Sequence, residues 1–372
     1  MSQSNLPDSY EGIHERARGL LQAGDVQGAI GLYRRLTDRL NRLSDRILDR
    51  RPQLRELHRQ ARLELASVLA GEGRYAEAMD VESVLLKTHP DGAERWRRDL
   101  AILRIARGDV EAGLSELREQ AEGAPGDPAR WLVLGVENRL AGRLRDSQEA
   151  LDRALEECSK DDDDNLVDTQ YQRFLLFKEM RQVEDALAAW EDAVSRNPEV
   201  ISAVGEVYTM LTDEGRYEEA LRYVARDPNP LQSGYQRGLL ASLTGKLGEA
   251  KDEWRKVAKL DPGEYEYGHD AWVEAVLRSG NPEPALEWLQ DSLPQYGTPR
   301  LLVLSGIGWA MRKDVEVATA LFQQAINIMR RQRPPKQKLD RADWQLLDSL
   351  VENEDIKEPL RSFFAVVATL WG

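Results

Sequence analysis

Apolar residues recur every three or four positions along most of the chain, and this spacing predicts amphipathic helices. No long stretch alternates apolar and polar residues in the period of two that is typical of a half-buried strand. Ala, Leu, Glu and Arg, which favour helix, are prominent in the composition. The pattern therefore predicts an all-α fold built from short helices separated by turns.

A turn followed by a small residue recurs along the sequence, most clearly as GRYAEA at 73–78 and GRYEEA at 215–220. We call these small residues anchors; there are nine, at Ala29, Ala78, Gly113, Ser147, Ala186, Ala220, Ala250, Ala285 and Ala318. Successive anchors are 49, 35, 34, 39, 34, 30, 35 and 33 residues apart. A period of about 34 residues accommodates two helices and their turns, so the sequence predicts about nine helical hairpins.

Positions at fixed distances from the anchors support the same alignment. Four residues after the anchor stands a large apolar residue, with Glu82 as the exception in the second unit. Twelve residues after four of the anchors stand the prolines Pro90, Pro125, Pro198 and Pro262, which end helices because proline lacks a backbone donor. Twelve residues before the anchor stands Ala or Gly in six units, where two helices approach closely. Phe174, Tyr208 and Val273 interrupt this last pattern, so we expect those three units to pack differently or more loosely.

Period, small residues, large apolar residues and terminal prolines together resemble the tetratricopeptide repeat over residues 11–333. The resemblance implies an α-α superhelix, a solenoid whose first helices line a concave surface. Residues 1–10 are then expected to be disordered and residues 334–372 to form C-terminal capping helices. Members of this family bind other proteins, so the resemblance implies a protein-interaction scaffold or adaptor with a protein or peptide partner.

Three irregular segments need separate interpretations. Residues 43–58 are surplus to the period, and their helical spacing predicts an extended second helix that stops near Pro52. The run at 161–165 (DDDDN) lacks the alternate acids and central glycine of a calcium loop, which favours a solvated acidic loop. The helix expected near Lys357–Trp371 has one apolar face, which favours a cap; docking on a membrane or a partner is the alternative.

Residue types that carry chemistry are scarce. The four histidines lie in different units without metal-ligand spacing, and Cys158 is the single cysteine. No phosphate-binding loop, nucleophile elbow or dinucleotide fingerprint occurs. We therefore predict no catalytic residue, no metal site, no cofactor and no enzymatic activity. The single cysteine, the absence of a signal-peptide pattern and the lack of an apolar run of membrane-span length favour a cytoplasmic protein.

The predicted groove is lined by positions of the first helices near the small residue. The candidate partner-binding residues are Arg98, Arg139, Tyr171, Gln172, Lys178, Tyr235, Gln236, Asp270 and Glu274. The triplet Tyr-Gln-Arg occurs twice, at 171–173 and 235–237, so two tyrosines are placed to hold an extended peptide, or else fill space between helices. The Lys and Asn pattern with which co-chaperone members of the family bind a C-terminal carboxylate is absent.

The distribution of charge along the chain suggests an alternative function. The formal net charge of -14 argues against a protein that coats nucleic acid or an anionic membrane. The two ends of the repeat region are nevertheless basic, and their candidate contact residues are Arg46, Arg50, Arg51, Arg330, Arg331 and Arg333. The alternative is a regulatory or accessory subunit of a nucleic-acid-associated or enzymatic complex that uses these Arg-rich surfaces.

Overall fold

The computed structural model describes residues 9–159, 161–296, 298–331 and 341–371. Helices and turns account for these residues, and no strand occurs among them. The all-α prediction is thereby confirmed. The chain divides into two compact units, Met1–Arg196 and Asn197–Gly372.

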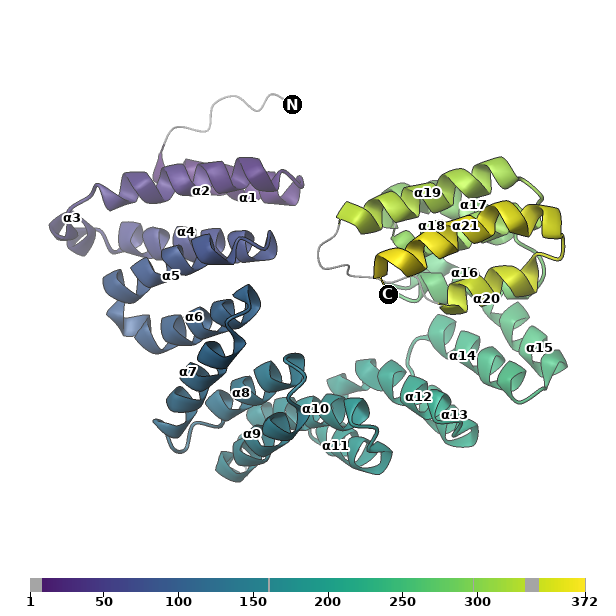
Figure 1. Cartoon of the computed structure of the whole chain (residues 1–372), viewed down its shortest axis with the longest axis horizontal. Coiled ribbons are helices and arrows are strands. Elements are labelled where there is room, and N and C mark those ends of the chain that lie inside the picture. Colours follow the sequence, from purple (N-terminus) through teal and green to yellow (C-terminus); the bar gives the residue numbers. More distant parts are fainter. Residues whose placement is uncertain (1–8, 160, 297, 332–340, 372) are drawn as a thin grey trace. The chain divides into compact units, whose positions relative to one another are not determined.

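The N-terminal unit is a succession of helix pairs that pack side by side (Figure 1). The pairs are α1/α2, α4/α5, α6/α7, α8/α9 and α10/α11, and we call their members first and second helices. Their bounds are α1 (Tyr10–Gln22), α2 (Val26–Asn41), α3 (Asp45–Arg50), α4 (Pro52–Gly71), α5 (Tyr75–Thr88), η1 (Pro90–Gly92), α6 (Ala93–Arg107), α7 (Val110–Glu122), α8 (Pro128–Leu140), α9 (Leu144–Glu157), α10 (Asp163–Glu179) and α11 (Val183–Arg196).

The C-terminal unit continues the same scheme with the pairs α12/α13, α14/α15, α16/α17 and α18/α19, followed by two further helices. Their bounds are η2 (Pro198–Ala203), α12 (Val204–Asp213), α13 (Tyr217–Val224), α14 (Pro230–Leu243), α15 (Leu247–Val257), η3 (Pro262–Glu264), α16 (His269–Arg278), α17 (Glu283–Tyr296), α18 (Pro299–Met311), α19 (Val315–Arg331), α20 (Arg341–Leu350) and α21 (Glu354–Trp371).

The anchors hold each pair together. Each of the nine lies in a second helix and is buried, and so is the residue four positions later. In the α8/α9 pair a Cβ added to Gly135 would lie 2.7 Å from Cγ of Leu151, so only glycine permits this approach. The turns that join helices use Gly73 and Gly215 at φ of +73°, a conformation that favours glycine.

Phe174, Tyr208 and Val273 replace the small residue in three units and are nevertheless fully buried, at 0%, 1% and 0% exposure. The expectation of looser packing at these positions is therefore wrong. Tyr208 shows one way in which a large side chain is accommodated: its ring is buried and its hydroxyl donates a hydrogen bond to the carboxylate of Asp227 at 3.1 Å.

Two predictions about the surplus segments need correction. The second helix α2 ends at Asn41, and the segment that follows forms the separate short helix α3. The interruption occurs because Ser44 adopts an extended conformation (ψ 152°). Arg51 is also non-helical, as expected before a proline, and α4 then starts at Pro52. The prediction of an extended second helix is therefore wrong.

The acidic run at 161–165 is not simply a solvated loop, because α10 begins inside it at Asp163. Asp162 is the N-cap: its carboxylate accepts hydrogen bonds from the backbone N–H of Asn165 at 3.4 Å and from the Asn165 side chain at 2.8 Å. The acids that follow lie at the positive end of the helix dipole. These residues therefore start a helix.

The chain ends match the expected segments in part. Helix α1 starts at Tyr10 with Ser9 as N-cap, so the first helix begins slightly earlier than predicted, and residues 1–8, which were predicted to be disordered, lie outside the described range. In the C-terminal unit, Leu347 of α20 and Leu360 of α21 are buried in the same apolar core as Phe322 of α19. The described part of both helices thus covers the last hairpin. The side chains of residues 363–371, including the rest of the apolar face predicted for α21, are not among those described.

Candidate partner-binding surface of the first helices

The first helices α8 and α10 bring three side chains together on one face of the N-terminal unit. Arg139 of α8 donates hydrogen bonds to the Gln172 amide oxygen at 3.2 Å and to the Glu179 carboxylate at 2.5 Å, both on α10. Arg139 and Gln172 were predicted as groove residues from different units, and the structure places them in contact. Glu179 was not predicted. The guanidinium side chain is only 12% exposed, so it fixes the two helices to each other.

Aromatic and cationic groups extend this face along α10. Tyr171 is half-buried, with its ring centroid 6.0 Å from that of Phe174. The Lys178 ammonium lies over the Phe174 ring at 5.8 Å from its centroid. The half-buried Tyr171 and Lys178 therefore keep accessible surface for a partner.

Two of the predicted residues of the C-terminal unit, Tyr235 and Glu274, form a buried cluster instead. The Tyr235 hydroxyl donates a hydrogen bond to the Glu274 carboxylate at 2.7 Å, and the two residues are 7% and 3% exposed. Glu274 also accepts hydrogen bonds from Arg278 at 2.8 Å and Arg300 at 3.0 Å, which leaves its charge well compensated. Burial and the adjacent Glu274 carboxylate raise the pKa of Tyr235 well above its ordinary value.

The prediction that Tyr235 and Glu274 are exposed contact residues is therefore wrong. The sequence equivalence of Tyr171 and Tyr235 also hides a difference, since one is half-buried and the other is buried. Gln236 and Asp270 remain half-buried, and Asp270 pairs with Arg300 at 3.5 Å. The sequence does not reveal Arg278 and Arg300 as partners of Glu274, because the pattern places this acid on the surface and not in the interior.

A pocket of about 410 Å³ opens between the first helices α4 and α6. We call it the inner pocket. It is lined by Leu63, Glu64, Ala66, Ser67 and Ala70 of α4, Glu82 of α5, and Arg95, Asp99, Ile102 and Leu103 of α6. Arg98, the predicted groove residue of α6, is half-buried beside it and pairs with Asp99 at 3.4 Å. The pocket combines an apolar wall with several acidic groups.

Glu82 is the unusual residue of this pocket, because it occupies the position where the other eight units have an apolar side chain. It is 4% exposed, and its Oε2 atom is buried without a hydrogen bond from any described residue. Burial, with a smaller contribution from the neighbouring Asp99 carboxylate, raises the pKa of Glu82 to about 7. The sequence marks Glu82 as the exception to the apolar pattern, but it does not show that the side chain is buried.

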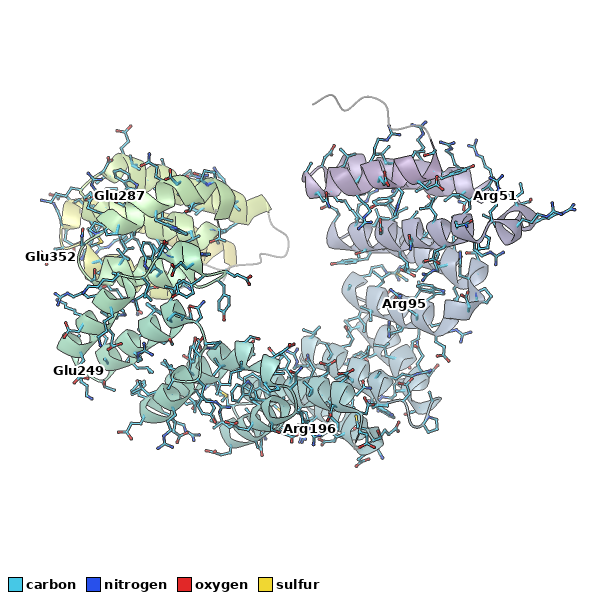
Figure 2. All side chains as sticks on the ribbon, turned by 180° about the vertical axis from the view of Figure 1, so that it is seen from behind. Arg51, Arg95, Arg196, Glu249, Glu287 and Glu352 are labelled. Carbon is cyan, nitrogen blue, oxygen red and sulfur yellow. The ribbon has the colours of Figure 1, made fainter. Side chains whose placement is uncertain are left out.

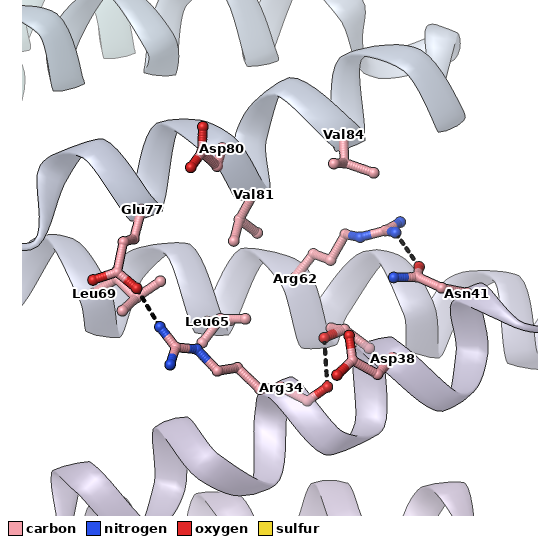
Figure 3. Close-up of a pocket in the computed structure, with 11 residues that line it drawn as sticks. Arg34, Asp38, Asn41, Arg62, Leu65, Leu69, Glu77, Asp80, Val81 and Val84 are labelled. Atoms are coloured by element: carbon pink, nitrogen blue, oxygen red, sulfur yellow. Dashed lines mark hydrogen bonds and ion pairs between the residues drawn. The ribbon is translucent and has the colours of Figure 1, made fainter.

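A second pocket, of about 340 Å³, which we call the outer pocket, is lined by residues of α2, α4 and α5 (Figure 3). Arg34 pairs with Glu77, and the buried Arg62 donates a hydrogen bond to Asn41. Burial lowers the pKa of Arg62 to about 10. Its cationic groups are thus already engaged by protein partners, unlike the buried acid of the inner pocket.

The predicted basic surface can be followed only at its first end. Arg46, Arg50 and Arg51 are exposed on α3 and directly after it, and Figure 2 shows Arg51 at the edge of the N-terminal unit. Arg333 and the side chains of Arg330 and Arg331 lie outside the described residues. Among the described residues, no group of three or more His, Cys, Asp or Glu has the arrangement of a metal site. No helix in that part of the chain has the length and apolar character needed to cross a membrane.

Comparison with known proteins identifies the repeat. Residues 14–93 match the sequence profile of the tetratricopeptide repeat family. This segment contains α4 and α5, which line the inner pocket together with α6. No sequence among the curated proteins matches the chain.

Solved structures with similar folds include three that cover much of the chain. A tetratricopeptide repeat protein from Parabacteroides merdae ATCC 43184 covers 74% of this chain and 100% of its own, at 14% identity and a TM-score of 0.41. YrrB, a tetratricopeptide repeat protein with an unusual peptide-binding site, covers 56% and 97%, at 14% identity and a TM-score of 0.37. Human IFIT1, solved as a dimer with PPP-AAAA, covers 86% and 73%, at 15% identity and a TM-score of 0.41.

The class of the protein follows from the matched profile together with the paired helices and buried anchors of the described chain. Residues 14–93 are tetratricopeptide repeats by their profile match, and the described chain as a whole is a helical-repeat protein.

Proposed function

We propose that this protein is a non-catalytic interaction scaffold that binds an extended segment of a partner protein across the first helices of its N-terminal unit. Binding of protein or peptide segments is the general use of tetratricopeptide repeats, whose stacked helices offer extended surfaces. The proposal for this chain rests on one observation: the inner pocket opens between first helices and contains a buried acid without a hydrogen-bonding partner at one oxygen.

Several features of the surface support a peptide ligand. The pocket wall contributes apolar contact from Ile102 and Leu103, which are half-buried. Further along the same set of first helices, Tyr171 and Lys178 offer an aromatic ring and a cation. Such a mixture suits an extended segment that inserts one side chain into a pocket and lays others over the neighbouring helices.

The experiment is a selection of short random peptides displayed on phage against the full chain, followed by affinity measurement on the enriched sequences. Ser67 is exposed at the inner pocket, so Ser67→Tyr blocks the pocket without replacing a buried residue. We expect this variant to weaken binding of the enriched peptides by at least about tenfold, the loss typical of blocking a central contact.

Val84 provides the matched control. It is 37% exposed on the second helix α5 and lines the outer pocket but not the inner one, so Val84→Tyr adds the same side chain away from the inner pocket. We expect binding to this variant to be unchanged. Failure to enrich any peptide, or equal binding to both variants, would contradict the proposed function.

The alternative of an accessory subunit that contacts a nucleic acid through basic ends stays a prediction. Exposure of Arg46, Arg50 and Arg51 is compatible with it. Loss of salt-dependent RNA or DNA retention on reversing these three charges is the result that would favour it over peptide binding.

A further inference from the structure

The inner pocket contains more negative charge than its own residues neutralise. Glu64, Glu82 and Asp99 line it, whereas Arg95 is its one basic lining residue. The Arg95 guanidinium pairs with Asp99 at 3.6 Å and lies over the Trp96 ring at 5.2 Å from its centroid. Its charge also acts on Glu82, but it lowers the pKa of that carboxyl by less than burial raises it.

Each of the other two acids has protein partners. Glu64 accepts hydrogen bonds from the His14 ring at 2.9 Å and from the Tyr33 hydroxyl at 2.5 Å. Asp99 pairs with Arg95 and with Arg98. Glu82 differs because its buried Oε2 atom receives no hydrogen bond from the described chain. A buried carboxylate is costly unless a cation or hydrogen-bond donors compensate its charge. Glu82 is therefore suited to bind a cation supplied by a ligand.

The rest of the pocket suits the stem of a long basic side chain. Leu63, Ala66, Ala70, Ile102 and Leu103 supply apolar surface beside the acids. Lysine and arginine carry three or four methylene groups below a charged head, and they commonly bury the stem along apolar surface while the head reaches a charged partner. The volume of about 410 Å³ leaves room for such a side chain and for water.

We propose that the inner pocket is a subsite for a lysine or arginine side chain of the bound partner segment, with Glu82 and Asp99 facing its charge and the α4 and α6 wall contacting its stem. This inference rests on the proposed function and names the chemistry of one residue of the ligand. The binding step is ionic and needs no further reactant: the cation enters, and a protonated Glu82 releases its proton to water.

The test uses a positional-scanning library of acetylated and amidated short peptides with Lys, Arg, norleucine or Glu fixed at each position. Norleucine has the apolar stem of lysine without its charge. At about pH 8, where the Glu82 carboxyl is ionised, we expect one position at which Lys or Arg binds at least about tenfold more tightly than norleucine. Glu82→Gln should reduce that preference to about twofold or less.

Asp80→Asn is the matched control, because Asp80 is exposed on the same helix α5 and lines the outer pocket. It removes the same charge and should keep the full preference for Lys or Arg. Circular dichroism on each variant checks that the helical fold is retained. An unchanged preference in Glu82→Gln, or a loss of preference in both variants alike, would overturn the assignment.

The dependence on pH gives a second readout. With the pKa of Glu82 near 7, binding of a Lys peptide should weaken about tenfold between about pH 8 and pH 6, and Glu82→Gln should lose this dependence. Glu64, Arg95 and Asp99 also face the pocket, and His14 contacts Glu64, so the variant isolates the contribution of Glu82. A pH dependence equal in both proteins would count against the subsite.

The outcomes separate the two proposals. If no peptide binds, or if Ser67→Tyr leaves binding intact, the proposed peptide surface fails and the subsite fails with it. If Ser67→Tyr abolishes binding but Lys, Arg and norleucine peptides bind equally well, the peptide surface stands and only the basic-residue subsite is overturned.

Discussion

Replacement of Glu82 by Gln should change the stability of the unliganded protein in a way that depends on pH. Burial first, and then the Asp99 carboxylate, raise the pKa of Glu82 from 4.5 to about 7 in the folded chain. The folded state therefore holds this proton more strongly than the unfolded state does. As pH rises from 4.5 to 7 the unfolded state ionises first, and the folded state loses about 3 kcal/mol of stability.

His58 of the same unit has the opposite dependence. Burial lowers the pKa of His58 from 6.5 to about 4, with smaller contributions from Arg62 and His89. The folded state thus favours the neutral imidazole, and about 3 kcal/mol of stability is lost as pH falls from 6.5 to 4. The two effects act in opposite directions over nearly the same interval, so in the wild-type protein they offset each other.

Urea denaturation of wild-type and Glu82→Gln protein at several values between about pH 4 and pH 8 separates the two groups. The difference in unfolding free energy, variant minus wild type, should increase by about 3 kcal/mol over this range. Its slope is the informative quantity, because the buried Gln amide adds a cost that does not change with pH. A difference that stays constant with pH would refute the argument that Glu82 is buried without compensation.

Three further substitutions test the packing and the helix start, each by urea denaturation. Gly238→Ala should destabilise by about 1–3 kcal/mol, because its Cβ would overlap the Trp254 ring at 2.6 Å from Cδ1, whereas Gly248→Ala has open space and should be neutral or stabilising. Equal effects would contradict this packing. Glu274→Ala should cost about 3–5 kcal/mol, because it leaves two guanidinium groups and a buried hydroxyl without their shared acceptor; a loss below about 1 kcal/mol would contradict the cluster. Asp162→Ala should cost about 0.5–2 kcal/mol as loss of a helix N-cap, and no change would disprove that role.

The hairpins were predictable because their determinants are local. A small anchor with a large apolar residue four positions later defines one helix face, and prolines mark where helices end. Both features can be read from the sequence without knowledge of tertiary contacts. The break between α2 and α3 was missed because the apolar spacing continues through Ser44, whose extended backbone interrupts the helix.

The binding residues were harder to predict because their exposure depends on neighbouring units. Tyr171 and Tyr235 occupy equivalent sequence positions, yet Tyr171 is half-buried, whereas Tyr235 is buried with its hydroxyl on the Glu274 carboxylate of the following first helix. Glu82 was noticed as an exception, but a charged residue in an apolar position gives no information on whether it is neutralised. That depends on the side chains of α4 and α6, which lie far from it in sequence.

The most direct test of the peptide-binding surface is a crystal structure of the full chain with the tightest selected peptide. We expect the peptide to lie over α4 and α6, with a lysine or arginine head group within about 4 Å of the Glu82 carboxylate, the limit for an ion pair. A peptide bound elsewhere, or one that leaves the inner pocket without a basic side chain, would contradict it.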